Sequence, residues 1–140
     1  MRRLPALAVP FALAVALLAA GCRRAPDPAA TYRAFARAAR SGDEDGAWAM
    51  LSVRSQAMLD DRARALSGRT GGVVPASGKD LLLGDAAAGA ARVKAAVTIR
   101  ESADSAVVRV ETEGAPAAEV SLVKEGGAWR IVLPEAAAPR

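Results

Sequence analysis

The hydrophobic pattern of this 140-residue chain changes its period near residue 93. From there onward, apolar and polar residues alternate in four short stretches, at residues 93–100, 106–111, 118–122 and 129–133. Alternation places successive side chains on opposite faces of a strand, so each stretch is expected to be a β-strand with one covered face. Turn residues separate the stretches, at 102–105, 114–116 and 125–127. Because parallel neighbours need much longer crossovers, these connections predict a four-stranded antiparallel meander.

The alternation also predicts which residues of each strand face the core. The expected inward residues are Val93, Ala95, Val97 and Ile99, then Ala106, Val108 and Val110, then Ala118, Val120 and Leu122, and finally Trp129, Ile131 and Leu133. On the opposite, open face of the sheet, Val107, Val123 and Val132 are candidate exposed apolar residues. We expect this face to bind a partner protein or a second copy of the chain.

Earlier in the chain the period is helical. Apolar residues recur at i, i+3, i+4 and i+7 from Tyr32 to Ala39, which predicts an amphipathic helix over residues 31–40. Asp43 is the expected N-cap of a second helix that carries Trp48, and a third helix is expected over residues 54–66.

A run of three leucines, residues 81–83, predicts one helical turn inside a loop rich in Gly and Ser. Helices followed by a meander define an α+β fold. We therefore expect a single domain over residues 31–134, with N-terminal helices packed across one face of a curved sheet.

The first residues form a three-part targeting pattern. Arg2 and Arg3 precede an uncharged apolar stretch, residues 4–20, that ends in small residues. This order is typical of a secretory signal peptide, here residues 1–21. The stretch is short for a membrane-spanning helix and contains two prolines. Cys22 follows directly, and as the only cysteine it forms no internal disulfide.

The run Leu17-Leu18-Ala19-Ala20-Gly21-Cys22 resembles the lipobox of bacterial lipoproteins. The resemblance implies that Cys22 receives a diacylglyceryl group, that the chain is cut before it, and that the new amine is acylated. Residues 22–30 then form a short tether, and residues 135–140 a flexible tail. Arg23 stands where an aspartate commonly retains such proteins in the inner membrane. The resemblance therefore implies the periplasmic face of the outer membrane, in a source with two membranes.

Three segments of the mature chain carry a second resemblance. They are the opening helix with Tyr32 and Phe35, the junction Ser41-Gly42-Asp43 leading to Trp48, and the closing run from Lys124 to Ile131. Together they resemble the nuclear-transport-factor-two-like superfamily, in its branch of small secreted bacterial lipoproteins. The resemblance implies a cone-shaped fold whose sheet wraps the helices around a pocket. In that superfamily the pocket holds a ligand, carries catalysis or is filled by side chains.

The composition of the chain argues against enzymatic activity and against nucleic-acid binding. The chain has no histidine, so it lacks the commonest general base and metal ligand. The acids of the predicted strands lie mostly on solvent faces or in turns, and the only tyrosine, Tyr32, is expected in the core. We therefore expect no enzymatic activity, no metal and no cofactor. The arginines are spread singly among acids, which is not the basic stripe of a nucleic-acid binder.

Five large side chains are candidates for lining a pocket inside the cone: Tyr32, Phe35, Trp48, Met58 and Trp129. The alternative, which we favour, is that they fill a core otherwise built from small residues, since ligand pockets also need a few convergent polar groups. The sequence thus predicts a lipid-anchored, non-catalytic envelope protein that serves as a protein-interaction or accessory module. The alternatives are a carrier or sensor of a small apolar ligand and, less favoured, a small isomerase or dehydratase.

Overall fold

The computed structural model describes residues 27–73, 77–82 and 93–134. The helices are α1 (Pro28–Ser41), α2 (Glu44–Ala49) and α3 (Val53–Arg69). The strands are β1 (Val93–Glu101), β2 (Ser105–Thr112), β3 (Ala118–Glu125) and β4 (Ala128–Val132). All neighbouring strands are antiparallel and follow one another in chain order, which confirms the α+β class and the predicted meander. The predicted signal peptide, Cys22 and the tail lie outside the described residues.

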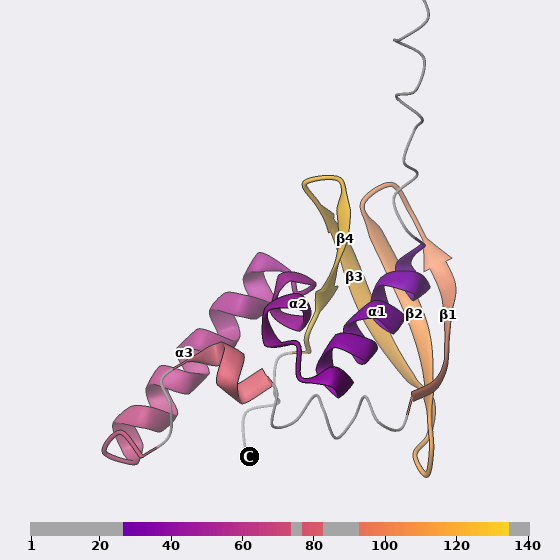
Figure 1. Cartoon of the computed structure of the whole chain (residues 1–140). Coiled ribbons are helices and arrows are strands. Elements are labelled where there is room, and N and C mark those ends of the chain that lie inside the picture. The colour runs from indigo at the N-terminus through magenta and orange to yellow at the C-terminus, as the bar shows by residue number, and fades with distance from the viewer. Residues whose placement is uncertain (1–26, 74–76, 83–92, 135–140) are drawn as a thin grey trace, which may run out of the picture.

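The helices are unevenly placed on the sheet. In Figure 1, α1 crosses one face of the sheet, α2 follows it, and α3 runs away from the sheet on the side of β4. The core lies between α1 and the sheet, where Phe35 meets Val108, Leu122 and Ile131. None of the helices in the described ranges is long and apolar enough to cross a membrane.

The start of α1 differs from the prediction. The helix begins at Pro28, three residues before the expected position, and Asp27 is its N-cap. A proline at the first helical position needs no hydrogen-bond partner for its missing N–H, so it favours a helix start there. Pro28 and Ala29 are both buried. Residues 28–30, expected at the end of the tether, are therefore part of the domain.

The other helices begin near their predicted positions. Asp43 caps α2 through a bond from the Gly46 N–H, as predicted. Ser52 caps α3, so that helix begins slightly before the expected residue 54. A helical turn covers residues 78–82, which confirms the predicted turn at Leu81 and at the buried Leu82, whereas Leu83 lies outside the described residues.

The inward face predicted for β1 is wrong over most of the strand. Ala96 is buried, whereas Val97 is 58% exposed and Ile99 is 37% exposed. The pairing of β1 with β2 shifts twice, between Val93 and Ala95 and again beyond Thr98. A shift of one residue moves the following side chains to the other face, because a strand has a side-chain period of two. Val93 still packs against the core, so the prediction fails only after the first shift.

In the other three strands the predicted inward faces are confirmed in their central residues. Val108 and Val110 of β2, Leu122 of β3 and Ile131 of β4 are each at most 2% exposed. The turn between β3 and β4 is the predicted Gly126-Gly127 pair, and both glycines have positive φ. Two such residues suit the type I′ turn of a two-residue hairpin, which matches the twist of the strands.

Both edges of the sheet are protected. Residues Met50 to Ser52 run along β4, where the Ser52 N–H donates to the Ile131 carbonyl at 2.9 Å and the Ile131 N–H donates to the Met50 carbonyl at 2.8 Å. On the other edge, Arg33 donates to the Ala96 carbonyl of β1 at 2.9 Å. Register shifts and covered backbone groups discourage the addition of another strand. The broad faces of the sheet are therefore better candidates for binding than its edges.

Candidate functional site

Four of the five residues predicted to line an interior pocket lie together in the core, where Phe35 and Trp129 are buried and Tyr32 and Trp48 pack against the same cluster. Trp129 is 3% exposed and belongs to the core, while Trp48 is half-buried against it. Met58 of α3 lines a separate shallow groove of about 240 Å³. Tyr32 and Phe35 share a pocket, and their ring centroids lie 6.1 Å apart.

The centre of the domain is filled by side chains. Its largest fully buried apolar side chains are those of Leu51, Leu122, Ile131, Val108 and Val110. In the described part of the chain, every buried side-chain polar atom has a hydrogen-bond partner. Unsatisfied polar atoms aimed into a cavity are what a ligand site of this kind would offer. The interior is thus a packed core.

A pocket of about 310 Å³ remains at the rim, where α1 meets the end of β4. We call it the rim pocket; its apolar lining includes Tyr32, Phe35, Val120, Ile131, Leu133 and Pro134. Burial raises the pKa of the Tyr32 phenol, because the charged phenolate is disfavoured away from water. The phenol therefore stays neutral well beyond physiological pH, and the pocket suits small apolar groups.

A larger hollow lies on the open face of the sheet, opposite α1. We call it the sheet-face groove; it measures about 370 Å³ and includes Ser105, Val107, Ser121, Val123 and Val132 in its lining. The strand register explains this grouping, because Ser121 pairs with both Val107 and Val132, and Ser105 pairs with Val123. The three valines predicted for this face are all present in the groove and are partly exposed.

Charged and further apolar residues surround the groove. Arg100 and Glu101 line one end of it. Arg109 and Glu119 form an exposed ion pair, 3.9 Å apart, on the same face of β2 and β3. Val97 pairs with Arg109 and therefore also lies on this face. Sequence reasoning missed Val97 because it assigned this residue to the core, and no residue pattern marks the register shift that turns it outward.

Two acidic side chains accept backbone N–H groups that lie far from them in the sequence. Glu125 accepts the Val53 N–H at 3.1 Å, at the start of α3. Asp60 accepts the Gly78 N–H at 2.9 Å and thereby holds the turn at residues 78–82 against α3. Over residues 27–73, 77–82 and 93–134, no three side chains of the metal-binding types come together.

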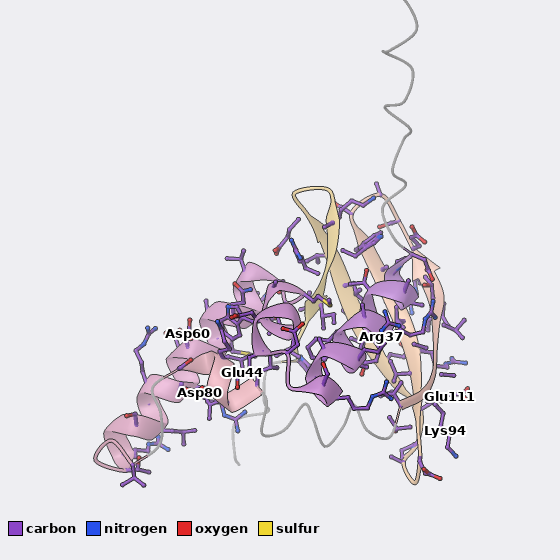
Figure 2. The ribbon with its side chains drawn as sticks, viewed as in Figure 1. Arg37, Glu44, Asp60, Asp80, Lys94 and Glu111 are labelled. Atoms are coloured by element: carbon purple, nitrogen blue, oxygen red, sulfur yellow. The ribbon has the colours of Figure 1, made fainter. Side chains whose placement is uncertain are left out.

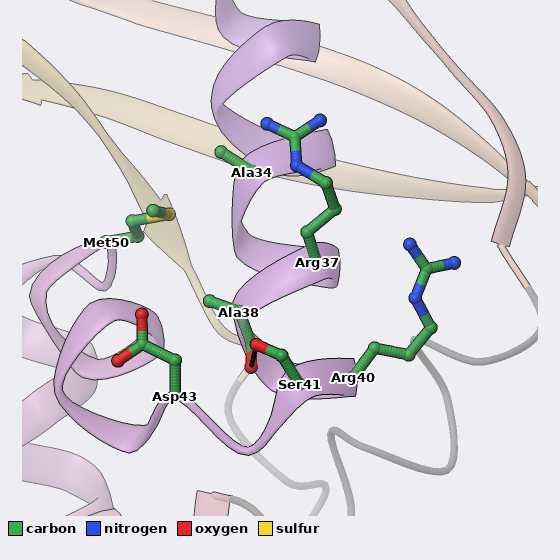
Figure 3. Close-up of a pocket in the computed structure, with 7 residues that line it drawn as sticks. All are labelled: Ala34, Arg37, Ala38, Arg40, Ser41, Asp43 and Met50. Atoms are coloured by element: carbon green, nitrogen blue, oxygen red, sulfur yellow. Dashed lines mark hydrogen bonds between the residues drawn. The ribbon is translucent and has the colours of Figure 1, made fainter.

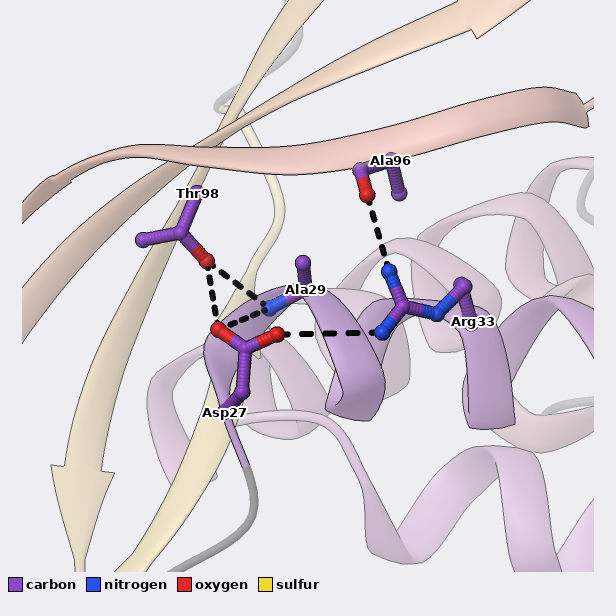
Figure 4. A network of polar contacts seen from close by, with 5 residues as sticks. All are labelled: Asp27, Ala29, Arg33, Ala96 and Thr98. Atoms are coloured by element: carbon purple, nitrogen blue, oxygen red, sulfur yellow. Dashed lines mark hydrogen bonds and ion pairs between the residues drawn. The ribbon is translucent and has the colours of Figure 1, made fainter.

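The start of α1 is tied to β1 by a small polar network, shown in Figure 4. The Thr98 hydroxyl donates to the Asp27 carboxylate at 2.7 Å and accepts the Ala29 N–H at 3.2 Å. Arg33 completes the network, 3.7 Å from the other oxygen of Asp27. Asp27 had been assigned to the tether and Thr98 to the outer face of its strand. The network fixes the first described residue after Cys22 to the sheet.

Comparison of the chain with protein-family models, with curated proteins and with solved structures gives no match to any of them. Function is therefore inferred from the residues and their geometry.

Proposed function

We propose that this protein is a lipid-anchored, non-catalytic component of a bacterial envelope that binds a protein partner through the open face of its sheet. The sheet-face groove carries the binding part of the proposal. It joins Val107, Val123 and Val132 from three strands into one partly exposed apolar surface. Partly exposed apolar residues with a polar rim are typical of protein interaction sites.

The charges around the groove favour a protein partner over a small apolar ligand. Arg100, Arg109 and Glu119 bring both signs of charge to the same face. Rim charges of both signs set the orientation of a partner and select it by complementarity. A second copy of the chain is one partner of this kind.

The anchor is supported by the lipobox-like run that ends at Cys22. The described domain begins only a few residues later, at Asp27. Membrane attachment through Cys22, on the periplasmic side of an outer membrane, would hold the domain close to the lipid surface.

We further propose that the domain is a filled member of the nuclear-transport-factor-two-like superfamily. Its order of helices before a four-stranded meander supports this, as do the resembling segments around Phe35 and Trp129. Trp129 and Phe35 both belong to the packed core. In such a member the cone would serve as a scaffold for the outer face of the sheet.

Mass spectrometry of the mature protein tests the anchor. We expect an N-terminus at Cys22 that carries the mass of the lipid groups. The variant Cys22→Ser is expected to lose its membrane fraction. An unmodified N-terminus elsewhere, or an unchanged membrane fraction in the variant, would contradict lipid anchoring.

Site-directed photo-crosslinking in the producing cell tests the sheet face. A photoreactive residue at Ser121, in the groove, is expected to give a defined adduct, whereas one at Ala65, exposed on α3, is not. Adding Val107→Asp should remove the adduct while leaving the folded protein at its usual level. Equal adducts at both positions, or an adduct that survives Val107→Asp, would refute this role of the face.

The rim pocket favours a second candidate, a carrier of a small apolar ligand. Its volume of about 310 Å³ is at the small end of the range for ligand sites. An apolar fluorescent dye would test it: Val120→Trp should fill the pocket and abolish binding, while Val107→Asp should leave binding unchanged. Dye binding that is insensitive to Val120→Trp would eliminate the rim pocket as a ligand site.

A further inference from the structure

Helix α1 contains basic side chains and no acidic ones. Its 14 residues include Arg33, Arg37 and Arg40 but neither Asp nor Glu. A spacing of four and then three residues places these side chains along one side of a helix. The buried residues Phe35, Ala38 and Ala39 lie on the other side of the helix. We call the three arginines the α1 arginine stripe.

Two members of the stripe have no partner within the described part of the protein. Arg33 is engaged with Asp27 and with the Ala96 carbonyl. Arg37 and Arg40 are exposed and make no ion pair or hydrogen bond with another described residue. Figure 3 shows both guanidinium groups extending from the helix beside a wide, open hollow of about 680 Å³.

Most of the acidic side chains that Figure 2 labels lie elsewhere. In Figure 2, Glu44, Asp60 and Asp80 lie on the side of α2 and α3, away from Arg37, whereas Glu111 lies beside Lys94 on the side of β1 and β2. One side of α1 is therefore positive, although the Asp43 carboxylate, the N-cap of α2, lines the same hollow as Arg37 and Arg40. A surface of this kind favours an anionic partner.

The chain places this positive side near the proposed anchor. Five residue steps separate Cys22 from Asp27, which span about 17 Å at full extension. Asp27 is fixed to Thr98 and opens α1, so α1 is the first described element after the anchor. The surface of the membrane that holds the lipid is thus within reach of the stripe.

We propose that Arg37 and Arg40 dock on the anionic phospholipid head groups of that membrane. The proposal rests on the lipid anchor at Cys22 and adds an orientation to it. Guanidinium groups bind phosphate oxygens in a bidentate manner, and the open hollow suits an extended surface better than a single enclosed anion. Because α1 and the sheet-face groove lie on opposite faces of the sheet, docking by α1 points the groove away from the membrane, toward its partner.

Reconstituted vesicles test the orientation. The mature protein is purified from cells that produce the full chain, and single cysteines at Ser41 or Ser121 carry a polarity-sensitive dye. In vesicles of phosphatidylcholine with phosphatidylglycerol, we expect the dye at position 41 to report the membrane and the dye at position 121 to report water. Phosphatidylcholine alone, or high salt, should abolish the signal at position 41.

The double variant Arg37→Gln/Arg40→Gln should shift the docking equilibrium about 30-fold, since an arginine near an anionic surface contributes about 1 kcal/mol. The matched control, Arg62→Gln/Arg69→Gln on α3, makes the same change in net charge and should have little effect. Equal effects of the two pairs would overturn the proposal. So would a membrane signal from position 121, or a signal at position 41 that persists without vesicles, which would indicate a second copy on the stripe.

The same labelling experiment tests lipid attachment at Cys22 independently of the α1 arginine stripe. In a lipidated protein the Cys22 sulfur is blocked, so only the introduced cysteine takes the dye. Labelling of Cys22 itself would refute the anchor. In that case, dye at position 41 that still responds to phosphatidylglycerol and to the arginine pair would support the stripe alone.

Discussion

Helices α1 and α3 are similar in length but are held in different ways. Seven of the 14 residues of α1 are buried, compared with three of the 17 residues of α3. In Figure 1, α1 lies along the sheet while most of α3 extends beyond it. The free energy of folding is therefore concentrated between α1 and the sheet, and α3 depends on a few local ties.

Those ties lie at two places along α3. At its start, Ser52 and Ser55 form a buried pair, and the Ser55 hydroxyl accepts the Leu133 N–H at 2.9 Å. Farther along, Gly78 contacts the helix at Asp60. Regions with few buried apolar contacts open at lower free energy than the rest of a domain. We therefore expect α3 to open locally while the sheet remains folded.

The largest expected effect comes from truncating Phe35 in α1. Phe35→Ala should lower the free energy of unfolding by about 3–5 kcal/mol, because it leaves a cavity in the core. Denaturant unfolding measures this, with hydrogen exchange of the β2 amides as a check. Leu59→Ala in α3 is the matched control, since both residues are 7% exposed. It should mainly loosen α3, and an equal loss of protection in β2 would remove the distinction between the two helices.

The parts of this fold that were predictable are those with a clear period. The alternation in β2, β3 and β4 predicted the meander, and the spacing around Phe35 predicted α1. The same rule misassigned Val97 and Ile99, because the shifts in β1 arise from tertiary pairing and not from local sequence. Pro28 falls in the segment expected to be the tether, although proline at the first position of a helix is favourable.

The candidate site also has residues that the sequence predicts and residues that it does not. Val107, Val123 and Val132 were predictable because adjacent strands of a meander bring alternate residues to one face. Of the rim pocket, Tyr32 and Phe35 were predicted as lining residues, but the rest of the lining was not, since it depends on where the chain leaves the sheet after Val132. The spacing of Arg37 and Arg40 is visible in the sequence. Their lack of partners among the described residues becomes apparent only from the positions of the acidic side chains in the fold.

A smaller effect is expected at the start of α3. Ser55→Ala removes a buried hydroxyl and leaves the Leu133 N–H without its partner, which should cost about 1–3 kcal/mol. Thr98→Val is the corresponding change at the start of α1, where the site is only partly buried. Thermal unfolding should show the larger loss for Ser55→Ala. A larger loss for Thr98→Val would mean that the network at Asp27 is the stronger tie.

The contact at Gly78 predicts a local effect. A Cβ atom there would lie 2.6 Å from the Asp60 backbone nitrogen, so Gly78→Ala must displace the turn at residues 78–82 from α3. We expect a loss of about 1–3 kcal/mol that is confined to α3 and this turn. Hydrogen exchange measured residue by residue would show where protection is lost.

Gly68→Ala is the control for this substitution. Gly68 is also a glycine of the α3 region, but its Cβ would meet nothing within 4 Å. Alanine there should be neutral or stabilise the helix by up to about 1 kcal/mol. If Gly78→Ala also proves neutral, the turn does not hold α3.

The smallest expected effect is the pH dependence of the exposed pair between Asp45 and Lys79, which joins the turn at residues 78–82 to α2. The hydrogen bond from Lys79 and its charge lower the pKa of Asp45, and the same hydrogen bond raises the pKa of Lys79. A lowered carboxyl pKa contributes stability above the unfolded value of about 4, and this contribution is lost as the pH falls through the folded value. The raised ammonium pKa acts oppositely, and its contribution is lost as the pH rises through the folded pKa of Lys79. Carboxyl titration by NMR should show the pKa of Asp45 returning to its ordinary range in Lys79→Met but not in Lys94→Met, and an unchanged pKa in Lys79→Met would show that the turn is not held by this pair.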